Sequence, residues 1–220
     1  MRALLLVSAL ALAGCSSAGA GPAPAITLNS ELTTPTDVTL TWDGHENQPV
    51  VVEFATEDEG PWTILDFLPG EISGYEHPDL LPQTTFRYRV RPVDGPVSDV
   101  HTAVDAAPPP SNEDWLPPAT RPDPAAKPVP QGAPTNVVVE ATAPDGVQVT
   151  WTDNASDEAG YLVEVQEAPD SPFVVLFVVD PDVNTVGLIT TPTQHTGTFR
   201  VRAYRFGAQS NVTEEETGGR

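Results

Sequence analysis

The stretch VQVTWTDNASDEAGYLVEV, residues 147–165, joins two apolar patterns through a polar, acidic segment. Val147, Val149 and Trp151 alternate with polar residues before that segment, and apolar residues resume at Tyr161. Alternation with a period of two predicts a β-strand that buries one face. The stretch therefore predicts two strands, and the acidic segment between them is either a turn or a site.

The acidic segment has the composition of a turn. It contains Asp153, Asp157 and Glu158, and Glu164 follows in the next strand. Asp and Asn side chains bond nearby backbone amides in turns, and Gly160 permits backbone angles that other residues avoid. A calcium site needs six to eight converging oxygens, and the segment lacks the regular Asp/Asn spacing of an EF-hand loop. We therefore interpret it as a structural loop, and the sequence predicts no metal site and no cofactor.

The same pattern occurs twice in the chain. Four segments of the first half match four segments of the second half in the same order. The pairs are VTLTW (38–42) with VQVTW (147–151), GPWTIL (60–65) with SPFVVL (171–176), FRYRVR (86–91) with GTFRVR (197–202), and VSDV (97–100) with QSNV (209–212). Short strands separated by frequent Pro and Gly turns favour a β-sandwich. The chain is thus predicted to be all-β, with two copies of one unit.

The second copy resembles the bacterial form of the fibronectin type III domain. Members of that family often read W-x-D-x-x-x-x-E-x-G-Y-x-V/I-E, and Trp151, Asp153 and Glu158 stand at the first three of these positions. The first copy keeps Trp42 and Asp43 but lacks the later part of the signature. The resemblance implies an immunoglobulin-like β-sandwich in each copy.

The N-terminus resembles that of a bacterial lipoprotein. Arg2 precedes an apolar run over residues 3–13, which is typical of a signal peptide and shorter than the roughly 20 residues of a membrane-spanning helix. LAGC (12–15) resembles the lipobox, which implies cleavage before Cys15 and acylation of that cysteine, palmitate included. Ser16 and Ser17 match the sorting pattern for the outer membrane.

The alternative for this region is a plain signal peptide cleaved after Ala18 or Ala20. Cys15 is the only cysteine of the chain. No internal disulfide is therefore expected, and stability must come from packed cores.

These features divide the chain into six predicted parts. They are a lipoprotein signal peptide (1–14), a tether (15–24), a fibronectin type III-like domain (25–104), a Pro-rich linker (105–133), a second such domain (134–214) and a tail (215–220). Proline fixes φ and cannot donate a hydrogen bond, so the linker is predicted to be a semi-rigid spacer between independently folding domains. Trp115 is the one large aromatic residue of the linker. It is expected either to dock on a neighbouring domain or to bind a partner.

The charge of the chain argues against a nucleic-acid-binding protein, and its motif content argues against an enzyme. The net charge of −21 repels phosphate backbones and anionic headgroups, so we expect no nucleic-acid binding and membrane attachment only through the lipid. The sequence has no H-E-x-x-H motif, nucleophile elbow or phosphate-binding loop. Its four histidines are isolated from one another: His45, His77, His101 and His195. We therefore expect no enzyme and no catalytic residue.

The arginines are concentrated in two predicted strands. Six of the ten basic residues lie in or just after them: Arg87, Arg89, Arg91, Arg200, Arg202 and Arg205. Glu53 and Glu164 lie on strands that the resemblance makes their neighbours. This arrangement predicts a cross-strand ladder of ion pairs, and the alternative is a face that recognises anions.

The sequence thus predicts a non-enzymatic, lipid-anchored protein of the bacterial cell envelope. It would be exported and held at the outer membrane or cell surface, or face the periplasm. Its two modules would bind an envelope protein or a glycan. The alternatives are a purely structural spacer of an envelope assembly and an accessory subunit of an extracellular hydrolase.

Overall fold

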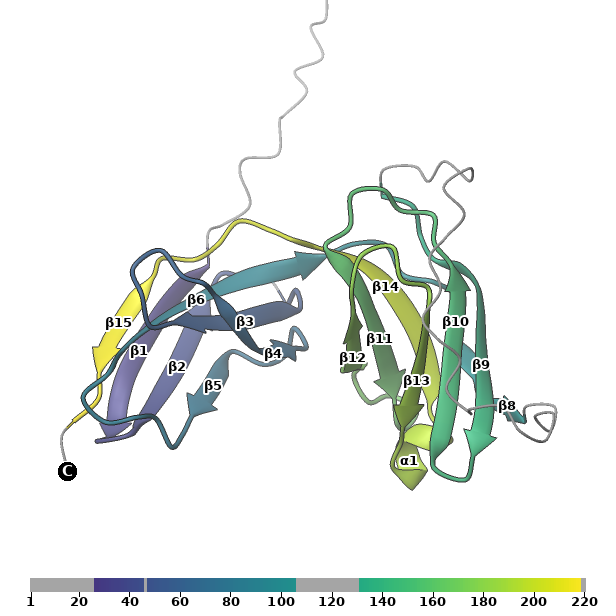
Figure 1. The fold of residues 1–220 in the computed structure, drawn as a ribbon, viewed down its shortest axis with the longest axis horizontal. Helices are drawn as coiled ribbons and strands as arrows, with labels where there is room; N and C mark the ends of the chain where they lie inside the picture. The colour runs from purple at the N-terminus through teal and green to yellow at the C-terminus, as the bar shows by residue number, and fades with distance from the viewer. Residues whose placement is uncertain (1–25, 46, 106–130, 219–220) are drawn as a thin grey trace, which may run out of the picture.

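The computed structural model describes residues 26–45, 47–105 and 131–218. Cys15 and the linker residue Trp115 lie outside these ranges, so the predictions made for them stay predictions. The described chain forms two β-sandwiches that lie side by side (Figure 1). Within it, no helix has the length and hydropathy needed to cross a membrane. The prediction of an all-β fold with two sandwiches is confirmed.

The first sandwich packs a three-stranded layer against a four-stranded layer. The first layer has the order β1 (Thr27–Thr34), β2 (Asp37–Asp43), β5 (Gly74–His77), and the second has the order β4 (Thr63–Leu68), β3 (Val50–Ala55), β6 (Thr85–Asp94), β15 (Thr213–Glu216). The alternation in β2 buries Val38, Leu40 and Trp42 completely. They meet Tyr88 of β6 in the core, as the period-two pattern predicts.

The second sandwich repeats this arrangement. One layer has the order β13 (Thr185–Ile189), β10 (Gly146–Thr152), β9 (Thr135–Ala143), β8 (Val104–Asp105), and the other has the order β12 (Val174–Val179), β11 (Gly160–Gln166), β14 (Thr198–Phe206), β7 (His101–Thr102). Trp151 packs against Tyr161 and Phe199 in its core. A short helix, α1 (Pro192–His195), precedes β14.

The closing strand of each sandwich comes from the other side of the linker. β15, at the C-terminal end, pairs with β6 of the first sandwich, whereas β7, which follows β6 in the chain, pairs with β14 of the second. The boundaries expected from the repeat place β7 in the first domain (25–104), and they divide β15 between the second domain (134–214) and the tail (215–220). The two halves have therefore exchanged their last strands, as the crossing of the yellow segment from β14 to β15 shows (Figure 1).

The exchange produces one long antiparallel ribbon that runs through both sandwiches. Residues 85–102 pair with residues 198–216, from Thr85 opposite Glu216 to Thr102 opposite Thr198. At the middle of the ribbon the chain passes close to its partner. A Cβ on Gly95, where φ is +139°, would lie 1.9 Å from the carbonyl oxygen of Ala203. Only glycine suits that crossing.

Two equivalent serines fix the ribbon on either side of its middle. Ser210 donates its backbone N–H to Val90 O and accepts the Val90 N–H on Oγ, at 2.8 and 2.9 Å. Ser98 makes the same two bonds with Val201, at 2.9 and 3.0 Å. These serines belong to the repeated segments QSNV and VSDV. Each segment therefore makes the same pair of hydrogen bonds, but with the sandwich that the other half of the chain forms.

A third apolar core joins the two sandwiches. Val51, Phe67 and Val93 of the first pack against Leu162 and Tyr204 of the second. The rings of Phe67 and Tyr204 meet edge to face, with centroids 5.5 Å apart, an arrangement that aromatic pairs prefer. The two sandwiches are thus in direct contact, although the sequence predicts two independently folding domains joined by a spacer.

Candidate functional site

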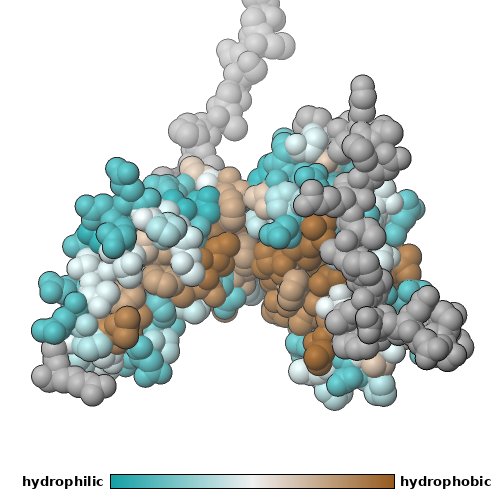
Figure 2. Space-filling view, viewed as in Figure 1, coloured by the Kyte–Doolittle hydropathy of each residue, from teal (hydrophilic) through white to brown (hydrophobic). Residues whose placement is uncertain are grey.

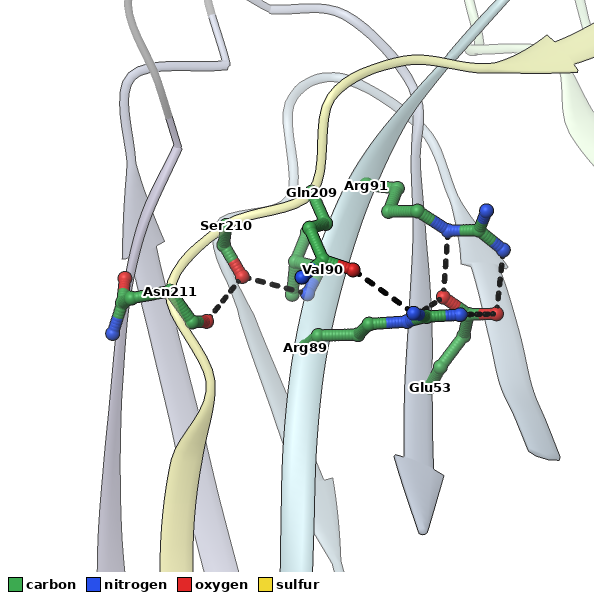
Figure 3. A network of polar contacts seen from close by, with 7 residues as sticks. All are labelled: Glu53, Arg89, Val90, Arg91, Gln209, Ser210 and Asn211. Atoms are coloured by element: carbon green, nitrogen blue, oxygen red, sulfur yellow. Dashed lines mark hydrogen bonds and ion pairs between the residues drawn. The ribbon is translucent and has the colours of Figure 1, made fainter. Parts of the chain in front are cut away.

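A buried carboxylate organises the polar surface of the first sandwich. Glu53 of β3 is only 2% exposed, and two arginines of β6 bond its carboxylate (Figure 3). Arg89 Nε lies 2.8 Å from Oε2, and Arg91 Nη2 lies 2.6 Å from Oε1. Arg89 also donates to Gln209 Oε1 at 2.9 Å. The exchanged C-terminal segment is therefore part of the same network.

The second sandwich contains the same network of one buried glutamate and two arginines. Glu164 of β11 is 2% exposed and pairs with Arg200 at 2.6 Å and Arg202 at 3.2 Å. Aromatic rings cover an arginine in each network, since Phe173 lies 3.8 Å from the Arg200 guanidinium and Phe206 lies 3.6 Å from that of Arg91. Such stacking adds a cation–π attraction to each pair.

The predicted ladder of ion pairs is confirmed. The two remaining arginines are paired as well, Arg87 with Asp58 and Glu214, and Arg205 with Asp157 at 2.7 Å. Removing one partner of a fully buried pair costs about 3–5 kcal/mol. These arginines retain some contact with solvent, so the expected loss is smaller. Because all six guanidinium groups are held by carboxylates, the arginines are poorly placed to recognise an external anion.

The acidic loop of the second sandwich is a turn in its backbone, as predicted. Asp153 Oδ1 accepts the backbone N–H of Ala155 at 2.9 Å and also accepts a hydrogen bond from the Tyr161 hydroxyl. Gly160 has φ of +149°, and a Cβ there would lie 2.4 Å from the carbonyl oxygen of Val179. These contacts explain why Asp, Gly and Tyr stand at these spacings.

The loop also brings together carboxylates that a turn does not require. Asp153 and Glu158 meet Asp182 of the β12–β13 turn, and one carboxylate oxygen from each lies within 4.8 Å of the others. Burial raises the pKa of the Glu158 carboxyl, and the negative charges of Asp153 and Asp182 raise it further. Asp182 could not be predicted as a member of this group, because nothing in its local sequence pattern ties it to the loop. Asp157 of the loop lies apart from the group and pairs with Arg205.

The two outer strands of the large sheet, β4 and β12, border a groove between the sandwiches. Figure 2 shows apolar residues on both facing sides of the hollow. The groove has a volume of about 380 Å³ and is lined by residues 64–67 and 175–178, of which only Asp66 is charged. Ile64 and Phe177 are 40% and 46% exposed. β4 and β12 are the ends of the eight-stranded sheet, so each has one edge beside which the described residues place no strand.

Three of the four histidines make local hydrogen-bond contacts. His45 Nε2 contacts Gly70 O at 2.8 Å, His77 Nδ1 contacts the Tyr88 hydroxyl at 3.1 Å, and His195 Nδ1 contacts Thr190 Oγ1 at 3.3 Å. Burial lowers the pKa of His77, which favours its neutral form. None of the carboxylate groupings found in the described residues includes a histidine.

Two solved structures that resemble this chain contain tandem fibronectin type III domains. A two-domain segment of chicken tenascin shares 12% identity, covers 87% of this chain and 97% of its own, and has a TM-score of 0.30. The FN1–FN3 domains of chicken CNTN1 share 18% identity, cover 89% of this chain and 67% of their own, and have a TM-score of 0.29.

The sequence itself matches no protein-family model and no curated protein. The order of the strands within the layers is the same in the two sandwiches, apart from β8, which extends one layer of the second.

Proposed function

We propose that this protein is a non-enzymatic, lipid-anchored module of the bacterial cell envelope that binds an extended segment of another protein. The observation that carries the proposal is the groove between β4 and β12, where two unpaired strand edges and exposed apolar side chains occur together. An extended peptide can add to such an edge, with backbone hydrogen bonds giving affinity and apolar pockets giving specificity.

The charge of the chain narrows the chemistry of the partner. With a net charge of −21, the protein repels acidic partners and attracts basic ones over distances of about 8 Å at physiological ionic strength. The groove itself is apolar apart from Asp66. We therefore expect a segment with apolar side chains flanked by Lys or Arg.

Capture from detergent-solubilised envelope tests the binding. The wild-type protein should retain a stoichiometric partner, and Phe177→Lys should abolish retention because the charge would enter the groove. Ile189→Lys is the matched control, since Ile189 is 74% exposed but lies on β13, in the other layer. In the complex, the backbone amides of β4 or β12 should gain protection from hydrogen exchange. A protein that retains nothing would instead be a spacer.

The lipid anchor has its own test. Cys15→Ser should release the protein from the membrane fraction or block its processing, because the thiol that carries the acyl chain is gone. Multiple acyl chains hold a protein firmly, at about 0.8 kcal/mol per buried CH₂ group. Ser16→Ala is the control and should fractionate like the wild type. Membrane retention of Cys15→Ser would overturn the lipoprotein assignment.

A further inference from the structure

Two carboxylates at one end of the second sandwich each have a buried oxygen atom without a hydrogen-bond partner. Asp153 is 4% exposed, and its Oδ2 atom has no hydrogen-bond partner although Oδ1 has two. Glu158 Oε2 is likewise buried and without a partner. Both carboxylates converge with Asp182. Burying an ionised carboxylate is costly unless a cation or hydrogen bonds compensate for the lost water.

The rest of the chain shows how this protein neutralises a buried carboxylate. Glu53 and Glu164 each receive two arginines. In contrast, no salt bridge of the described residues involves Asp153, Glu158 or Asp182, which we call the Asp153 cluster. Arg205, the arginine that follows Arg200 and Arg202 in β14, pairs with Asp157. The basic side chains of the described residues therefore supply no positive charge to this cluster.

We infer that Asp153, Glu158 and Asp182 bind one calcium ion. The ligand atoms are all carboxylate oxygens, which hard cations prefer. One oxygen of each carboxylate lies within 4.8 Å of the other two, close enough for one ion to contact all three. Calcium accepts an irregular set of oxygen ligands, whereas magnesium demands near-ideal octahedral geometry, so carboxylates from two loops suit calcium better. Water and backbone carbonyls would complete the coordination.

The position of the site gives it a role in joining two loops. Asp153 and Glu158 precede β11, while Asp182 lies in the turn between β12 and β13. An ion shared by them would tie together both layers of the second sandwich. With three protein carboxylates on surface loops, the dissociation constant should be in the range of about 10⁻⁴–10⁻³ M that extracellular calcium modules show.

Thermal unfolding of the full chain at constant ionic strength tests the site. For a dissociation constant of about 1 mM, 10 mM calcium should raise Tm by about 3–6 °C. Asp182→Asn should lose this shift while keeping the fold, because residue 182 is exposed and Asn tolerates its φ of +61°. Glu57→Gln removes one exposed charge elsewhere and should keep the whole shift.

Terbium provides a second readout that does not depend on stability. Tyr161 bonds Asp153, so Tb³⁺ bound at the site should show luminescence on excitation of the tyrosine, and calcium should displace it with a stoichiometry of one. Glu158→Gln should lose this signal. Equal binding by Glu158→Gln and the wild type would overturn the proposal, as would equal shifts for Asp182→Asn and Glu57→Gln. An equal response to magnesium would overturn the assignment to calcium.

Discussion

A chain that ends at Phe206 should lose its N-terminal sandwich and keep its C-terminal one. The truncation removes β15, which pairs with β6 over residues 213–216, and Ser210, which bonds Val90. It also removes Asn211, whose side chain bonds both backbone groups of Leu28 at 2.8 Å. The first sandwich would thus lose one complete strand, whereas the second would keep β7 and β8.

Hydrogen exchange resolved by peptide would show the expected pattern. Amides of β2 and β3 should lose their protection, while those of β10 and β11 should remain protected. If each half closed itself with its own last strand, the same truncation would open the second sandwich instead. Loss of protection confined to β10 and β11 would therefore show that the strands are not exchanged.

Engineered disulfides provide a matched control on the full chain. In a Cys15→Ser background, Arg87→Cys with Glu214→Cys should form a disulfide, because these residues are direct partners in the ribbon and cross-strand Cα distances of about 4.5–5.5 Å suit the bond. Without exchange, Thr102 would take the place of Glu214. Arg87→Cys with Thr102→Cys should therefore stay reduced.

The strands and the two cores could be predicted from local sequence, but the exchange could not. Alternation around Trp42 and Trp151 reports which face of a strand is buried, and both side chains are buried in the structure. The closing segments VSDV and QSNV, however, carry the same serine and the same spacing. Each fits either sandwich equally well by pattern, so only contacts distant in the chain decide the pairing.

The ion pairs and the acidic cluster show the same limit. The ladder was predictable because alternation places Arg89 and Arg91 on one face of β6 and the fold places Glu53 on the adjacent strand. The cluster was not predictable because Asp182 comes from a separate turn. A period-two pattern shows which side chains share one face of a sheet. It carries no information about which loops meet at the end of the sheet.

Trp42→Ala should lower the stability of the entire described chain, and not of the first sandwich alone. Replacing a buried tryptophan by alanine typically costs about 3–5 kcal/mol, and Trp42 is among the largest fully buried side chains. The sequence predicts separate transitions for two domains joined by a spacer. The structure instead shares a ribbon and the core around Val51 and Leu162 between both sandwiches, so the two should unfold together.

Calorimetry distinguishes these outcomes. Wild type, Trp42→Ala and Trp151→Ala should each give one transition, with the calorimetric and van't Hoff enthalpies equal for the full chain. Trp62→Ala is the control, because Trp62 is only partly buried and stacks on Arg89 at 4.2 Å, so it should cost about 1 kcal/mol or less. Two transitions, of which Trp42→Ala moves only one, would contradict the shared ribbon. In the full chain the exchange links the two cores, since unfolding of either sandwich pulls on the shared ribbon and opens the core around Val51 and Leu162.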